Sequence, residues 1–174
     1  MSLSVCLLFD QRTDRALRAL WGRLESIGVS TLLTHTHEKH LPHLSYAVLR
    51  SWDIDRVIEA VASLPASTPI PLHFDTVGHF HRGRAALIAA PCTDLLDRQK
   101  RMVSALTSTG ADLHHYYLPG RWVPHTGLAT HVRAAQLARM TSLAHDVLPL
   151  DATATGAAII DSGTGLRHDL AIIP

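Results

Sequence analysis

One unit of sequence occurs twice in this chain, and the repeat constrains the fold more than any other feature. The first copy is LPHLSYAVLRSWDIDRVIEAVASLP and the second is VPHTGLATHVRAAQLARMTSLAHDVLP. Each copy runs from an apolar residue, proline and histidine through a short strand and an amphipathic helix to Leu-Pro. Two such units can pack face to face about a pseudo-twofold axis. His43 and His125, which lie 82 positions apart (125 − 43), would then converge on one cleft.

The spacing of apolar residues predicts the remaining elements. Short apolar or alternating runs indicate strands at residues 3–9, 43–49, 70–80, 84–90, 125–131, 152–161 and 165–173. Helical spacing indicates helices at 12–27, from the Asp53 cap to Pro65, from the Thr93 cap to Gly110, and at 133–147. This order favours an α+β fold of two pseudo-symmetric lobes, each an antiparallel-rich sheet with outer helices, flanking a central cleft. No Gly/Ser-rich linker interrupts the chain, so residues 1–174 are expected to form a single bilobal domain.

Composition and charge narrow the class of partner. The chain has 174 residues, of which 47% are hydrophobic and 18% charged, so a sizeable core is expected. The net charge is +1 with histidine neutral, which gives no basic excess for binding long nucleic acid. A small phosphorylated molecule or the end of an RNA remains compatible with this charge.

The cysteines and the apolar segments predict the environment of the chain. Cys6 and Cys92 do not form a disulfide framework and are expected to be ordinary buried thiols. The first residues, MSLSVCLLFD, lack the basic segment and the long apolar run of a signal peptide, and no stretch is long enough to span a membrane. We therefore expect a cytoplasmic protein without membrane contact, and a monomer.

A histidine-rich segment offers an alternative chemistry. The chain contains 13 histidines, and His35, His37, His40 and His43 lie close together in THTHEKHLPH. Imidazole groups at this spacing could bind a transition metal. The segment has no helical pair of histidines that would aim two ligands together, and no cysteine lies nearby. We expect no metal, and a histidine-rich metal-binding protein stays as the alternative.

The two histidine motifs resemble those of a known superfamily. They read His43-Leu44-Ser45-Tyr46 and His125-Thr126-Gly127-Leu128, and the second stands in the sequence LPGRWVPHTGLA. The chain resembles the 2H phosphoesterase superfamily, which includes bacterial RNA 2′,3′-cyclic phosphodiesterases, also called 2′–5′ RNA ligase-like proteins. The signature of that superfamily is two copies of His-x-(Ser/Thr)-x about eighty residues apart. The succession of predicted elements agrees with the superfamily along nearly the whole chain.

The resemblance implies a fold, an activity and a site. It implies the 2′–5′ RNA ligase-like fold and a metal-independent hydrolase acting on a 2′,3′-cyclic phosphate or a 2′–5′ phosphodiester, with no cofactor. The partner would be an RNA terminus or a small cyclic or 2′–5′-linked nucleotide, as in RNA processing. His43 and His125 would act as general acid and base, since an imidazole can take either role near neutral pH. Ser45 would hold a phosphate oxygen, because side chains two apart on a strand share a face.

The second motif departs from the signature. Gly127 stands where the superfamily has Ser or Thr, and it has no hydroxyl to donate. Thr126 should point to the opposite face of a regular strand, unless a β-bulge turns it toward the phosphate. Alternatively, the Gly127 backbone leaves room for a water that contacts phosphate, or this half-site is weaker. Thr126 and Gly127 are therefore both candidates for phosphate binding, and a catalytically weak or inactive nucleotide-binding module is the alternative function.

Other residues could contact a nucleotide. Arg82 and Arg84 lie near a predicted hairpin turn and could meet a phosphate, although arginines at such places are usually just exposed. Tyr116 and Tyr117 could stack on a base, as aromatic side chains do on unpaired bases. Trp122 is expected to pack in the interior.

Overall fold

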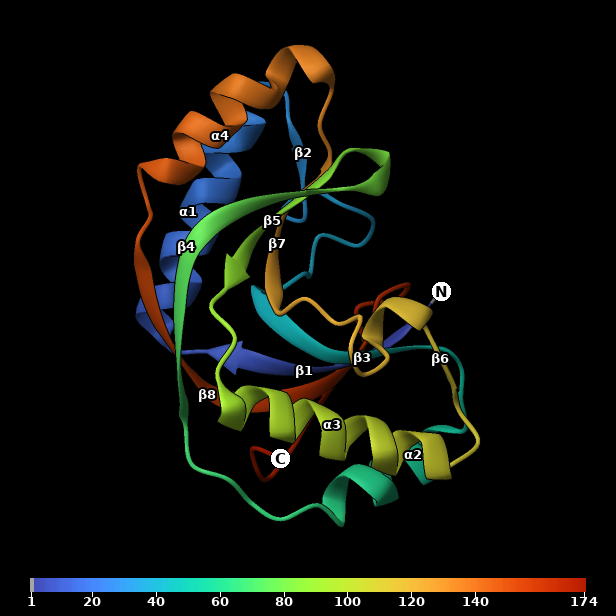
Figure 1. Cartoon of the computed structure of the whole chain (residues 1–174). Helices are drawn as coiled ribbons and strands as arrows, with labels where there is room; N and C mark the ends of the chain where they lie inside the picture. Colours follow the sequence, from blue (N-terminus) through green and yellow to red (C-terminus); the bar gives the residue numbers. More distant parts are fainter. Residues whose placement is uncertain (1) are drawn as a thin grey trace.

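The computed structural model describes residues 2–174 as an antiparallel sheet with four α-helices (Figure 1). The strands are β1 (Leu3–Phe9), β2 (Ser30–Thr31), β3 (His43–Ser51), β4 (Ile70–Phe80), β5 (Arg84–Ala89), β6 (Asp112–Leu113), β7 (His125–His131), β8 (Leu150–Asp161) and β9 (Arg167–Asp169). The helices are α1 (Gln11–Glu25), α2 (Ile54–Ala62), α3 (Thr93–Ser108) and α4 (Leu137–His145). The predicted α+β class is confirmed, and so is the predicted succession of the longer elements.

The strands form one sheet rather than the two that the sequence predicts. Their order is β2-β7-β5-β4-β8-β1-β3-β6, with β9 beside β8, and every pairing is antiparallel. The long strand β8 joins the lobes, because its first half pairs with β4 while its second half pairs with β1 and β9. A further pairing between β3 and β7 closes β7, β5, β4, β8, β1 and β3 into a ring. This pairing brings the two copies of the repeated unit side by side.

Each lobe is covered by a helix from the other half of the chain. Helix α1 follows β1 in sequence but contacts β7 and α4, whereas α3 follows β5 but contacts β3 and α2. Figure 1 shows α1 and α4 together on one side of the molecule, and α2 and α3 together on another. Each half of the chain thus contributes one helix to the other half, and this symmetry in the structure matches the repeat in the sequence.

Local capping explains where two of the helices begin. The Asp10 carboxylate accepts a hydrogen bond from the Thr13 backbone at the start of α1, and Asp53 does the same for Asp55 and Arg56 at the start of α2. The predicted Thr93 cap is wrong, because Thr93 is the first residue of α3. Its capping position is Cys92, whose side chain makes no capping hydrogen bond with the described residues. Cys6 is buried as expected, but Cys92 is exposed because it lies at this helix start, so the expectation that it is buried is wrong.

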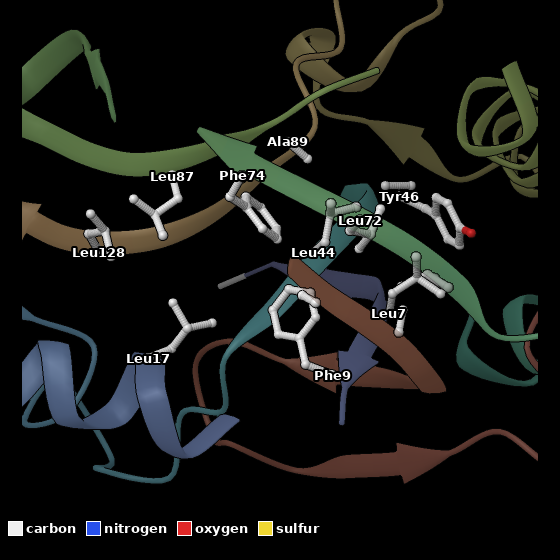
Figure 2. Packing of buried hydrophobic residues seen from close by; sticks show 14 of the residues in the cluster. Leu7, Phe9, Leu17, Leu44, Tyr46, Leu72, Phe74, Leu87, Ala89 and Leu128 are labelled. Carbon is white, nitrogen blue, oxygen red and sulfur yellow. The ribbon is translucent and has the colours of Figure 1, made fainter. Parts of the chain in front are cut away.

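A single cluster of buried hydrophobic side chains fills the space between the strands and the helices. Figure 2 shows Leu7 and Phe9 of β1, Leu44 of β3 and Phe74 of β4 within this cluster. The Phe9 and Phe74 rings meet edge to face, with centroids 5.9 Å apart. Along the first half of β4, buried Ile70, Leu72 and Phe74 alternate with exposed residues, so one side of this strand faces the core.

Some boundaries differ from the sequence prediction. The predicted strand at 165–173 is reduced to β9, and the short strands β2 and β6 lie between the predicted elements, where no strand was expected. Both short strands pair at an edge of the sheet, and partners distant in sequence leave no local pattern. No helix among residues 2–174 is long and apolar enough to cross a membrane.

Candidate active site

The pairing of β3 with β7 determines which motif residues share a face. Leu44 lies opposite Thr126, and both side chains are fully buried in the core. Because side chains alternate along a strand, the residues on either side of this pair point to the other face of the sheet. This face, called here the histidine face, carries His43, Ser45, His125 and Gly127.

The antiparallel register places the two histidines diagonally across the strand pair. Continuing from the Leu44–Thr126 pair, His43 lies across from Gly127 and Ser45 lies across from His125. Diagonal neighbours in such a pair are about 7–8 Å apart at Cα, a separation that one phosphate group can bridge with its oxygens. Within the described residues, the structure therefore brings His43, Ser45, His125 and Gly127 together.

Both imidazoles are held by the same local hydrogen bond. His43 Nδ1 is 2.6 Å from the Leu41 carbonyl oxygen, and His125 Nδ1 is 2.7 Å from the Val123 carbonyl oxygen. A carbonyl oxygen can only accept, so Nδ1 carries a proton and donates it in each case. The neutral ring then has its lone pair on Nε2, which points away from the backbone bond. Each histidine can accept a proton at Nε2 when neutral, or donate one from Nε2 when protonated.

The proline of each motif explains why this hydrogen bond recurs. Pro42 and Pro124 are both buried, and each stands between the histidine and the residue whose carbonyl accepts the bond. Proline has a fixed φ angle and favours extended backbone in the residue before it. The apolar-Pro-His sequence is thus a rigid local device that orients the imidazole.

Burial keeps both histidines neutral near pH 7. The pKa of His43 is lowered from 6.5 chiefly by burial; the hydrogen bond to Leu41 acts against this, and the charge of His125 lowers it further. The pKa of His125 is also lowered by burial, against the opposing effect of its bond to Val123. A bound phosphate anion would favour the protonated form of either ring, so substrate binding would raise the pKa of the histidine that acts as acid.

The Ser45 hydroxyl is paired with a second hydroxyl. Its Oγ lies 2.7 Å from the Ser4 Oγ on the neighbouring strand β1, and both side chains are buried. Ser4 therefore helps to fix the orientation of the Ser45 hydroxyl. The sequence motif does not include Ser4, since the pairing of β1 with β3 is needed to find it.

Two indole groups hold the third residue of each motif. Trp122 Nε1 donates to the Ser45 carbonyl oxygen at 3.0 Å, and Trp21 Nε1 donates to the Gly127 carbonyl oxygen at 2.9 Å. Trp122 packs against Tyr46, in agreement with the prediction that it packs in the interior. Trp21 is fully buried on α1 and has no signal in the sequence, because its partner lies 106 positions away.

The second half-site is less polar than the first. The Thr126 side chain lies in the core and its Oγ1 makes no hydrogen bond, so the structure does not bring this hydroxyl to the histidine face. At Gly127, a Cβ atom would lie 3.0 Å from Leu32 Cδ1. An apolar side chain thus stands beside the place where the superfamily signature has a hydroxyl.

The histidine-rich segment forms a stack of rings. The His37 and His40 ring centroids are 4.2 Å apart, and those of His35 and His40 are 5.7 Å apart. Burial, with the charges of His37, His35 and His43, lowers the pKa of His40 to about 4. In the part of the chain that the structure describes, no group of three His, Cys, Asp or Glu side chains is arranged to hold a metal ion.

Comparisons with known proteins show the family and the fold of this chain. The sequence matches the profile of the 2′–5′ RNA ligase superfamily over residues 13–166, which includes both histidine motifs. This chain belongs to the 2′–5′ RNA ligase superfamily. It is therefore placed among phosphoesterases and ligases. No curated protein sequence matches it.

Solved structures with the same fold share little sequence with this superfamily member. The crystal structure of E. coli LigT complexed with NADP+ aligns with a TM-score of 0.60 and 12% identity, covering 97% of this chain and 93% of that one. A crystal structure described as a phosphoesterase aligns with a TM-score of 0.59 and 12% identity, covering 96% of this chain and 92% of that one. At this identity the likeness concerns the fold, and the predicted 2′–5′ RNA ligase-like fold is confirmed.

Proposed function

We propose that this chain is a metal-independent phosphoesterase that hydrolyses a 2′,3′-cyclic phosphate or a 2′–5′ phosphodiester in an RNA end or a small nucleotide. The observation that carries the proposal is the matched pair of imidazoles on the histidine face. Each has its Nδ1 proton held by a backbone carbonyl and its Nε2 free of any hydrogen bond within residues 2–174. Membership of the superfamily and the nucleotide in the LigT crystal support the same class of ligand.

The proposed reaction uses one histidine as base and the other as acid. Nε2 of the neutral histidine takes a proton from water, and the water oxygen forms a bond to phosphorus. The bond between phosphorus and one ribose oxygen breaks, and the protonated histidine gives its Nε2 proton to that oxygen. Ser45 donates a hydrogen bond to a phosphate oxygen, which strengthens as charge develops in the transition state.

Hydrolysis of nucleoside 2′,3′-cyclic phosphates tests this proposal directly. We expect turnover of at least one of the four common nucleotides, at an unchanged rate in EDTA. His43→Ala and His125→Ala should each lower kcat by about 10²- to 10⁴-fold, because each removes one proton-transfer group. Thermal melting is the control for folding. Wild-type turnover in both folded variants, on a verified substrate, would contradict the acid-base roles.

A second candidate function rests on Gly127 and Leu32. The histidine face has one hydroxyl donor in place of two, and Leu32 occupies the neighbouring space. These features favour a catalytically weak or inactive module that binds a nucleotide or an RNA terminus. Binding of a nucleoside 2′- or 3′-monophosphate without turnover of any cyclic phosphate or 2′–5′ dinucleotide would support this second candidate.

Restoring a hydroxyl at position 127 separates the two candidates further. Gly127→Ser should raise kcat/KM by up to about 10- to 100-fold, because a hydrogen bond to a charged oxygen contributes about 1.5–3 kcal/mol. Leu32→Ala in the same chain makes room for the new side chain. Leu32→Ala alone is the matched control. If Gly127→Ser with Leu32→Ala has the activity of that control, a missing hydroxyl does not limit the reaction.

A further inference from the structure

Strands β4 and β5 form a wall beside the histidine face. An aromatic ring on this wall lies close to His125. Ile88 of β5 pairs directly with His125 of β7, and the Phe80 ring lies with its centroid 5.1 Å from the His125 ring. A Cβ atom on Gly78 would meet Ile88 at 2.7 Å and Phe80 at 3.6 Å. The absence of a side chain at Gly78 therefore lets the Phe80 ring fold back along the strand toward the histidine.

Arg84 lies on this wall beyond the ring. It pairs across the hairpin with Phe80, and it shares a face of β5 with Ile88, from which it is separated by about 13 Å along the strand. Its side chain is exposed. Three groups therefore follow one another along the wall: the proton-transfer group of His125, the apolar ring of Phe80 and the cation of Arg84.

Arg84 has no carboxylate partner among residues 2–174. This distinguishes it from the arginines that form ion pairs there: Arg18, Arg23, Arg50, Arg98 and Arg167. The residues that feel its charge are Tyr117 and His114, which lie on the segment that leads to the second motif. The pKa of His114 is lowered by burial, then by His115, and then by Arg50 and Arg84. An exposed cation without a carboxylate partner among these residues is available to an anion from outside the protein.

We propose that Arg84 binds a second phosphate group of the substrate, so that the preferred ligand is a nucleotide with phosphates on both sides of its nucleoside. This rests on the proposed function, in which the first phosphate lies between His43 and His125. The nucleoside lies against Phe80, since bases and sugars pack on aromatic rings. The guanidinium then meets the 5′-phosphate, for which its planar set of donors is well suited.

Calorimetric binding of two nucleotides tests this assignment without requiring turnover. Adenosine 3′,5′-bisphosphate should bind the wild-type chain about 10- to 100-fold more tightly than adenosine 3′-monophosphate. Arg84→Gln should remove this preference while leaving the affinity for the 3′-monophosphate unchanged, and Arg84→Lys should keep part of it. Arg82→Gln, which removes a positive charge from the tip of the same hairpin, is the control and should keep the full preference.

The outcomes separate this proposal from the proposed function. Equal affinity of the wild-type chain for the two nucleotides, or no binding of the bisphosphate, overturns the Arg84 assignment. A preference that survives in folded Arg84→Gln, or that Arg82→Gln removes equally, overturns it as well. Hydrolysis of adenosine 2′,3′-cyclic phosphate is measured separately. The chain could bind the bisphosphate more tightly, in a manner that depends on Arg84, and yet hydrolyse no substrate. That result would refute the proposed phosphoesterase activity and still support the second phosphate site.

Discussion

At the scale of single residues, the motif strands β3 and β7 each have one face toward the candidate site and one face toward the core. Ser45 and Thr126 both carry hydroxyls near a motif histidine, but Ser45 bonds to Ser4 whereas Thr126 Oγ1 is buried without a partner. Burying a hydroxyl without a hydrogen bond costs about 1–3 kcal/mol. The Thr126 hydroxyl is therefore a cost to stability at a place where it cannot reach the phosphate.

The two hydroxyls should respond differently to removal. Ser45→Ala should lower kcat/KM by about 10- to 100-fold, because it removes a donor to a charged oxygen. Thr126→Val keeps the shape of the side chain, so it should leave kcat/KM unchanged and raise the free energy of unfolding by about 1 kcal/mol. Steady-state kinetics and urea unfolding measure both effects. A loss of activity in Thr126→Val as large as in Ser45→Ala would show that Thr126 acts at the phosphate.

At the scale of elements, helix α1 supports the strand that carries the second motif. Trp21 reaches from α1 to the Gly127 carbonyl, while Trp122 reaches the Ser45 carbonyl from the segment before β7. The two indoles differ in burial, since Trp21 is fully buried and Trp122 is half-buried. Water can replace a lost donor at the second place but not at the first.

This difference predicts unequal effects of two matched substitutions. Trp21→Phe should lower the free energy of unfolding by about 2–4 kcal/mol, because it removes a fully buried donor from the Gly127 carbonyl and opens a cavity. Trp122→Phe should cost less, about 1 kcal/mol. Urea unfolding of the two variants makes the comparison. An equal or larger loss in Trp122→Phe would mean that burial does not decide the strength of these bonds.

At the scale of the whole molecule, burial disfavours the protonated, charged form of several histidines. Burial lowers the pKa of His40 to about 4, and it also lowers the pKa values of His43, His114 and His125. In the unfolded chain these groups protonate near pH 6.5. Between these values the unfolded state binds more protons than the folded state, so stability is lost as the pH falls.

The free energy of unfolding should therefore decrease from pH 7 to pH 4.5. The lowered pKa values of Asp10 and Glu25 also make stability fall with pH, but mainly below about pH 5, at the acid end of this range. The raised pKa of His73, caused chiefly by its bond to Asp151, works in the opposite direction. Urea unfolding at the two pH values checks the trend, and His40→Gln should reduce it. A stability that is constant or rises toward pH 4.5 would contradict this account.

Much of the fold was predictable because its pattern is local. The apolar periodicity of β1, β4 and α1 and the cap at Asp53 depend on neighbours within a few residues, and these predictions are confirmed. The short strands β2 and β6 escaped prediction, since only their partners make them strands. The joining of two expected sheets into one depends in the same way on β8 and on the contact between β3 and β7.

The sequence by itself determined the chemistry available at the candidate site. The Pro-His motifs place an imidazole at the start of a strand in each half, the alternation of side chains puts Ser45 and Gly127 on the same face as these histidines, and glycine lacks a hydroxyl. The tertiary structure alone decided which groups surround that chemistry. The Ser4 hydroxyl, the Trp21 indole and the Leu32 methyl group reach the motifs from distant parts of the chain. Their positions follow from how the whole core packs, and no local periodicity encodes a contact between residues 41 or 106 positions apart.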